Sequence, residues 1–191
     1  MGNSGINLLI ESLPQLLKGL EQTLLIACFT IIISTIGGIL FGIIRTSKIT
    51  ILRFISRTYI ELFRSIPILV WLFLFFFGLP ITLGIDVSST VAAITALSLW
   101  GITEIGEIVR GALQSLPKGQ VEAGKSIGMN KKQLYQYVLI PQAIRRMIPA
   151  TINIFIRIIQ TTSLTVLIGV TEVIKAGQQI VERTGEAFLI Y

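Results

Sequence analysis

The sequence predicts an all-α integral membrane protein, on its composition, its apolar stretches and the placement of its basic residues. The chain has 191 residues, of which 52% are hydrophobic and only 14% charged. Its mean hydropathy of +0.80 lies outside the usual range of a soluble domain. It contains four apolar stretches long enough to cross a bilayer, which takes about 20 helical residues. Its basic residues gather between those stretches. We therefore expect a single transmembrane domain over residues 1–191.

Four membrane spans are expected at Leu20 to Ile44, Ile66 to Leu83, Val87 to Val109 and Met147 to Val170. The first has no basic segment ahead of it and no cleavage site after it, which favours a retained helix over a signal peptide. On this span Ser34, Gly38 and Gly42 form a small-x-x-x-small ridge, which predicts a packing surface. Pro67 predicts a kink near the start of the second span. A fifth span is expected to start at Ala187 and is cut off by the end of the chain.

The distribution of Lys and Arg predicts the orientation in the membrane. Five basic residues follow the first span and seven follow the third, together twelve of the chain's 16. Because cytoplasmic loops carry an excess of Lys and Arg, both segments are expected in the cytoplasm and the N-terminus outside. The same topology accounts for the net charge of +6 without nucleic acid as a partner.

Metal and thiol chemistry are not expected. The chain has no histidine, which removes the commonest zinc ligand and general base, and its single cysteine, Cys28, lies in an apolar run. We predict no catalytic residues and no metal site.

One pattern in the long connection after the third span suggests nucleotide binding. Gly119, Gly124, Lys125 and Ser126 match G-x-x-x-x-G-K-S, the phosphate-binding loop. That motif needs a strand before it, and the preceding residues contain a proline and no β-branched apolar run. The carboxylate of Glu122 inside the motif would also repel phosphate. We therefore expect no nucleotide site here.

The same stretch predicts a short cytoplasmic helix. Gln120 to Ile127 begins after Pro117, and Gly128 ends it. A second amphipathic segment is expected over Lys131 to Leu139, ending at Pro141. Such a helix between spans is either a docking element or a loop lying on lipid headgroups, and the pattern alone favours neither.

A resemblance favours the docking element. Glu122, Ala123 and Gly124, then Gly128, and then Val138, Ile140 and Pro141 resemble the E-A-A-x-x-x-G-(x9)-I-x-L-P signature of bacterial ABC-importer permeases, with Gly124 in place of an alanine. Three further stretches resemble the polar amino acid uptake branch of that family (histidine, glutamine and arginine permeases): ELFRSIP from Glu61, EIVRGALQSLPKG from Glu107 and TTSLTVLIG from Thr161.

The resemblance implies a type I importer fold, called MetI-like, in the bacterial cytoplasmic (inner) membrane. It has four full transmembrane helices plus the start of a fifth, and a coupling helix at residues 120–128. The implied partners are a cytoplasmic ATPase dimer, a second permease (an identical copy or a sister subunit), an extracytoplasmic substrate-binding protein, an amino acid substrate and membrane lipid. ATP and Mg²⁺ would sit on the ATPase, and this chain would bind no cofactor. The implied coupling residues are Glu122, Ala123, Gly124, Gly128 and Pro141.

Polar side chains inside spans suggest a substrate path, because they are costly in a membrane. Asn153, Arg157 and Gln160 share one helical stripe, and Glu104 and Glu107 lie at i, i+3 on the third span. Arg157 and Glu104 would hold the carboxylate and ammonium of an amino acid, or else pair with each other. For Glu107 we favour a structural pair with Arg110.

Two departures from the family pattern lie in this path. Glu104 stands where relatives often carry an aromatic residue, and Gln160 with Thr161 where many carry a lysine and an acidic residue. A permease for another small polar solute is therefore an alternative, as is an ion-coupled secondary transporter, although the chain shows no inverted repeat. Which amino acid is moved does not follow from the sequence.

Overall fold

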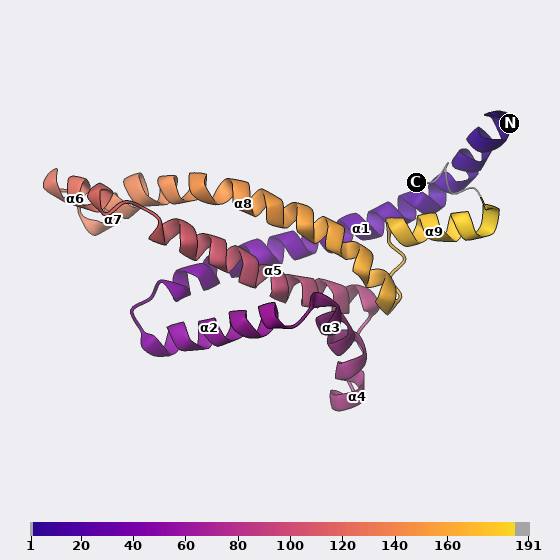
Figure 1. The fold of residues 1–191 in the computed structure, drawn as a ribbon, viewed down its shortest axis with the longest axis horizontal. Helices are drawn as coiled ribbons and strands as arrows, with labels where there is room; N and C mark the ends of the chain where they lie inside the picture. Colours follow the sequence, from indigo (N-terminus) through magenta and orange to yellow (C-terminus); the bar gives the residue numbers. More distant parts are fainter. Residues whose placement is uncertain (1, 186–191) are drawn as a thin grey trace. The chain divides into compact units, whose positions relative to one another are not determined.

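A computed structural model describes residues 2–185, where all regular structure is helical, as predicted (Figure 1). In chain order the elements are α1 (Gly2–Arg45), α2 (Thr50–Ser65), α3 (Ile68–Phe73), η1 (Leu74–Gly78), α4 (Leu79–Leu83), α5 (Ser89–Gln114), α6 (Lys118–Ser126), α7 (Lys131–Gln133), η2 (Leu134–Leu139), α8 (Ile140–Thr161), η3 (Thr162–Ile168) and α9 (Val173–Thr184).

The chain divides into two compact units. The first holds the described residues of Met1–Thr30, Ile68–Leu97 and Arg157–Tyr191, and the second holds Ile31–Pro67 and Ser98–Ile156.

Three helical runs within residues 2–185 are long and apolar enough to cross a membrane: Ile10–Arg45, Ser89–Gln114 and Lys131–Ile168. They contain most of the first, third and fourth predicted spans. A fourth crossing results if Thr50–Ser65 and Ile68–Leu83, which meet at a bend of 99°, count as one span. The predicted start of a fifth span at Ala187 lies outside the described residues.

Pro67 separates two helices, whereas the sequence predicted a kink within one. α2 ends before it, and Ile66 is extended, with φ −99° and ψ 128°. This conformation is favoured in front of a proline, because the proline ring crowds the helical alternative. The helical run resumes at Ile68 and stops at Gly84, whose φ of 65° suits glycine.

Two other prolines come two residues after a π-helical segment. Pro80 follows η1 and Pro141 follows η2. A proline has no N–H, and its ring crowds the carbonyl four residues earlier. The wider π winding shifts the bonding, and the Ile140 N–H accordingly bonds the Tyr135 carbonyl, five residues back. The helix therefore continues through Pro141 into α8, and the prediction that this segment ends at Pro141 is wrong.

In the second unit α1 packs closely on α5 through glycines. A Cβ built on Gly38 would lie 2.6 Å from Cβ of Ile105, and one on Gly42 would lie 2.5 Å from Cβ of Val109. The Ser34 hydroxyl donates a hydrogen bond of 3.3 Å to a backbone carbonyl of α5. The predicted ridge is therefore a packing surface, because no larger side chain fits there.

In the first unit α1 is tied to the start of α9. The backbone N–H of Val173 donates to the Thr23 hydroxyl at 3.1 Å. Glu172 is only 1% exposed. Its carboxylate accepts hydrogen bonds from the N–H groups of Ile174 at 3.0 Å and Lys175 at 2.7 Å. The free amides of the helix N-terminus thus compensate the buried charge.

α8 carries an unpartnered apolar stripe. Ile144, Ile148, Ile152 and Ile156 follow one another at four-residue spacing, and each is about half exposed. Exposed isoleucines in such a row are typical of a helix that meets lipid or another subunit.

The glycine contacts predict a contrast between two substitutions. Gly42→Ala should lower the stability of the chain by about 1–3 kcal/mol, because the new methyl group would also lie 2.7 Å from the Gly106 carbonyl oxygen. Gly111→Ala, on α5, should be neutral or stabilising, since nothing lies within 4 Å of its added Cβ. Melting temperatures of the detergent-solubilised variants measure the difference. Equal melting temperatures would contradict the close packing of α1 on α5.

Candidate functional site

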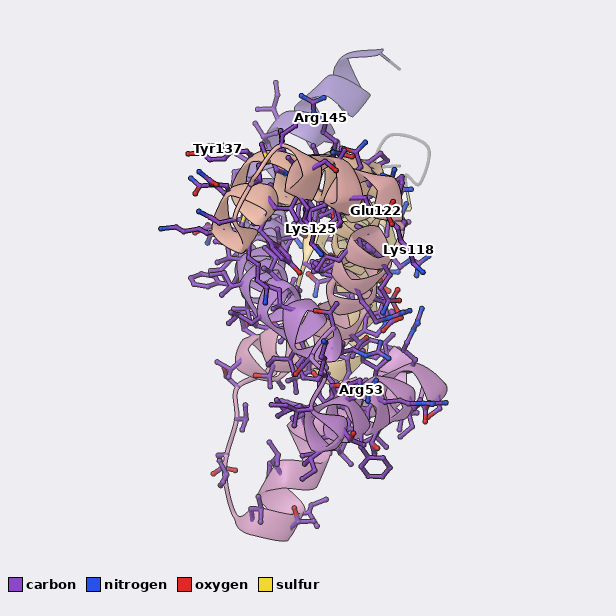
Figure 2. The ribbon with its side chains drawn as sticks, turned by 90° about the vertical axis from the view of Figure 1, so that its left-hand side faces the viewer. Arg53, Lys118, Glu122, Lys125, Tyr137 and Arg145 are labelled. Carbon is purple, nitrogen blue, oxygen red and sulfur yellow. The ribbon has the colours of Figure 1, made fainter. Side chains whose placement is uncertain are left out.

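α6 is a short helix whose surface is largely exposed. Glu122, Ala123 and Lys125 are exposed, and Figure 2 shows Lys118, Glu122 and Lys125 extending outward from it. An acidic side chain flanked by a small residue and two lysines is therefore open to contact with another molecule.

The end of α6 is held by a glycine turn. Gly128 has φ 80°, and its N–H bonds the Lys125 carbonyl at 3.0 Å. The N–H of Met129 bonds the Gly124 carbonyl at 3.0 Å. These two bonds form a Schellman cap, in which the residue with positive φ is normally glycine. The predicted helix stop at Gly128 is confirmed.

The phosphate-loop pattern has no matching geometry. Residues 119–126 lie within α6, and α5, a helix, precedes them where that motif requires a strand. The amides of residues 122–126 are inside the helix and are not arranged around an anion. Within residues 2–185 no group of three or more His, Cys, Asp or Glu side chains is placed to hold a metal ion.

Gly124 is the buried residue of α6, and its neighbour is Leu134 of η2. A Cβ on Gly124 would lie 2.5 Å from Cδ1 of Leu134 and 3.5 Å from Sδ of Met129. Leu134 is itself only 4% exposed. Gly124 thus packs closely against another residue of the same chain. This packing explains why the chain has a glycine where the family signature has an alanine.

Two polar contacts also hold this region. The Gln142 side chain donates to Oε1 of Gln120 at 3.0 Å, which links α8 to α6. Arg146 donates to the carbonyl of Ser115 at 2.6 Å and to its hydroxyl at 2.9 Å, which links α8 to the residue after α5. α6 is therefore fixed to η2 by packing and to the start of α8 by a hydrogen bond.

The two glutamates of α5 are both paired with arginines. Glu107 forms ion pairs with Arg45 and, at 2.8 Å, with Arg110, so the predicted pair with Arg110 is confirmed. Glu104 pairs with Arg64 of α2 at 3.1 Å, a partner that the sequence did not indicate. Both carboxylates are largely shielded, and the guanidinium groups compensate their charge. These contacts lie within the second unit.

Asn153, Arg157 and Gln160 lie on one face of α8 and are exposed. Gln160 also lines a cavity of about 460 Å³ in the first unit. Thr23 and the buried Glu172 line the same cavity. Arg157 and Glu104 lie in different units, and both alternatives for them, substrate binding and mutual pairing, stay predictions.

Comparison with known proteins identifies the family. Residues 14–187 match the family described as binding-protein-dependent transport system inner membrane component. The chain belongs to this family. Among its relatives, the probable amino-acid permease protein YxeN of Bacillus subtilis is 41% identical over 172 residues, which are 89% of this chain and 77% of that protein. The glutamine transport system permease protein GlnP of Escherichia coli K12 is 33% identical over 181 residues, 94% of this chain and 83% of that protein.

Solved structures agree with this assignment. A crystal structure of an amino acid ABC transporter with histidines matches with a TM-score of 0.86 and 29% identity, over 96% of this chain and 85% of that chain. An inward-facing methionine transporter, MetNI, matches with a TM-score of 0.71 and 21% identity, over 93% of this chain and 85% of that chain, and supports the fold alone. The predicted permease family and its MetI-like fold class are thus confirmed, and the chain is an inner-membrane component of a transport system.

The residues that hold α6 in place were missed by the sequence argument. Leu134, Gln142 and Arg146 belong to no motif that we identified. A weak indication existed for Gln142 and Arg146, because they lie on the same α8 stripe as Asn153, Arg157 and Gln160 by helical spacing.

The Gly124 contact predicts a rescue experiment. Gly124→Val should undock α6, at a cost of about 1–3 kcal/mol, and expose the bonds after Lys125, Lys131 and Lys132 to trypsin. Adding Leu134→Ala should slow that cleavage again, because the smaller side chain makes room for valine. Gly119→Val is the matched control, since nothing lies within 4 Å of a Cβ there. If the two single glycine variants were cleaved at the same rate, the packing role of Gly124 would be refuted.

Proposed function

We propose that this chain is the permease subunit of an ATP-driven importer and forms the path of a polar amino acid. The family match supports the transport role. The amino-acid substrate rests on the relatives, which are named as amino-acid or glutamine permeases. The chain performs no bond chemistry and binds no ATP or Mg²⁺, which belong to the partner ATPase.

The proposed topology is that of a multi-pass inner-membrane protein with its N-terminus outside. Both basic segments then lie in the cytoplasm, together with α6. The partners are a cytoplasmic ATPase dimer, a second permease and an extracytoplasmic substrate-binding protein. The family description itself names a transport system that depends on a binding protein.

α6 is the coupling helix in this proposal. The observation that carries it is the combination of an exposed Glu122 and Ala123 with a buried Gly124 on the same short helix. The exposed face meets the ATPase, and Glu122 faces a basic or polar groove there. The buried face passes movement to Leu134 and so to the run that leads through Pro141 into α8. Because coupling is reciprocal, ATP binding and the state of the path bias each other through this contact.

The substrate path is proposed along the polar face of α8. Arg157 binds the substrate carboxylate, flanked by Asn153 and Gln160. Glu104 is less available to bind the substrate ammonium group, because it already pairs with Arg64. Glu107 pairs with Arg45 and Arg110, which supports a structural role for Glu107. Another small polar solute would use the same face, whereas no observation favours an ion-coupled transporter.

Charge reversal at Glu122 tests the coupling role. Glu122→Arg should weaken binding of the ATPase subunit at least about tenfold, because like charges across an interface repel. The chain alone should not hydrolyse ATP. Adding the ATPase to the wild-type chain should raise ATP hydrolysis, whereas adding it to the Glu122→Arg variant should not. Glu182→Arg, on the exposed surface of α9, is the charge-matched control and should bind normally. Hydrolysis by the chain alone would overturn the permease assignment.

Removal of the guanidinium of Arg157 tests the substrate path. Arg157→Ala should abolish uptake of a radiolabelled amino acid into proteoliposomes, since truncating a charge-assisted pair costs about 2–5 kcal/mol, while the ATPase stays bound. Arg145→Ala, on the same helix but off the stripe, should transport normally. Normal uptake by Arg157→Ala would rule out the carboxylate role.

A further inference from the structure

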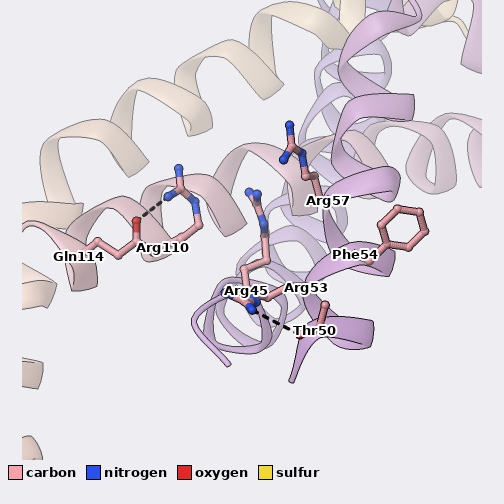
Figure 3. Close-up of a pocket in the computed structure, with 7 residues that line it drawn as sticks. All are labelled: Arg45, Thr50, Arg53, Phe54, Arg57, Arg110 and Gln114. Carbon is pink, nitrogen blue, oxygen red and sulfur yellow. Dashed lines mark hydrogen bonds between the residues drawn. The ribbon is translucent and has the colours of Figure 1, made fainter. Parts of the chain in front are cut away.

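Four arginines line one cavity of the second unit, beside the ends of two candidate membrane spans. The cavity measures about 400 Å³ and is lined by Arg45, Thr50, Arg53, Phe54, Arg57, Arg110 and Gln114. Figure 3 shows these side chains coming from α1, α2 and α5. Arg45 is the last residue of α1 and Gln114 the last of α5. The cavity therefore lies where two of the helices that are long and apolar enough to cross a membrane end.

The cavity has an excess of positive charge. None of its lining residues is acidic. Glu107 pairs with Arg45 and Arg110, and Glu61 pairs with Arg57 at 2.7 Å. Two carboxylates thus face four guanidinium groups, which leaves a surplus of two positive charges.

Arg53 is the arginine with the weakest compensation. Its guanidinium donates a long hydrogen bond of 3.5 Å to the neutral Thr50 hydroxyl, and it pairs with no carboxylate among the described residues. Guanidinium groups bind phosphate in a bidentate manner. The cavity is thus suited to an anion with several oxygens.

One apolar side chain lines the same cavity. Phe54 is 70% exposed and connects the cavity to an apolar face of α2, on which Ile51 and Ile55 are also exposed. Arg53 and Arg57 follow each other one turn apart on the other side of Phe54. A basic edge beside an exposed apolar face is typical of a helix in the headgroup region of a membrane.

We propose that this cavity binds the phosphate headgroup of an anionic phospholipid, with the acyl chains against Ile51, Phe54 and Ile55. The bound phosphate relieves the repulsion among the arginines and thereby fastens α2 to the ends of α1 and α5. Placement in the cytoplasmic leaflet rests on the proposed topology, whereas the binding itself does not.

The test uses the purified full chain in neutral detergent, without ATPase or transport substrate. Native mass spectrometry measures binding of phosphatidylglycerol and of phosphatidylcholine with the same acyl chains. The wild type should prefer phosphatidylglycerol at least tenfold, and the double variant Arg53→Gln, Arg57→Gln should lose that preference. Lys131→Gln with Lys132→Gln removes the same charge from exposed positions of α7 and should retain it. Loss of the preference in both double variants would mean general charge attraction and refute a specific site.

Two further experiments identify the ligand and locate its binding site. A photoactivatable phosphatidylglycerol should label peptides that contain residues 50–57, and labelling elsewhere would refute the site even if the double variant misfolds. Inorganic phosphate should not displace the lipid at an equal concentration, and displacement would assign the cavity to a soluble phosphate. If the double variant kept the lipid preference, Arg53 and Arg57 would not hold the headgroup and the proposed site would be refuted. Because these arms need no transport, their failure is distinct from failure of the proposed function.

Discussion

The structure depends on one constraint, which is that backbone groups in a membrane must find their hydrogen-bond partners within the chain. Continuous helices meet it, and two of the prolines show how a helix continues past a residue that cannot donate. Pro80 and Pro141 each follow a π segment, where the Leu79 and Ile140 amides bond carbonyls five residues back. The bonding pattern shifts where the proline cannot donate, and the helix continues. This shift accompanies the helical link from α7 to α8, on which the proposed coupling depends.

Within that constraint the second unit is held by two kinds of contact. Glycines let α1 and α5 approach, and ion pairs join the charged residues that the spans contain. An unpaired carboxylate in an apolar environment is far more costly than a paired one, so Glu107 and Glu104 require Arg45 and Arg64. Beside the ends of α1 and α5, however, arginines of α1, α2 and α5 outnumber the carboxylates.

The sequence predicted those features that depend on single segments. Apolar length predicted the main spans, and the helix stop at Gly128 followed from the conformations that glycine allows. The pairing of Glu104 with Arg64 and the packing of Gly124 on Leu134 were not predicted, because they join segments whose proximity no local pattern encodes. The π segments escaped prediction for another reason. A proline after an amphipathic run normally predicts the end of a helix. The helix continues at Pro141 because the hydrogen bonding before it is altered, and the sequence gives no sign of that change.

The arrangement of contacts limits how movement can reach the proposed substrate residues. α6, Leu134, Gln142 and Arg146 belong to the second unit, whereas Arg157 and Gln160 belong to the first. α8 contains residues of both units in one continuous helix. A displacement of α6 is resisted locally, because Gly124 and Gln120 fix it to η2 and α8 and leave little room for independent movement. If α6 is the coupling helix, a displacement is therefore passed to the part of α8 that lies in the second unit. A rigid attachment of α6 is then a condition for the proposed coupling, since a loose helix would absorb the movement of the partner.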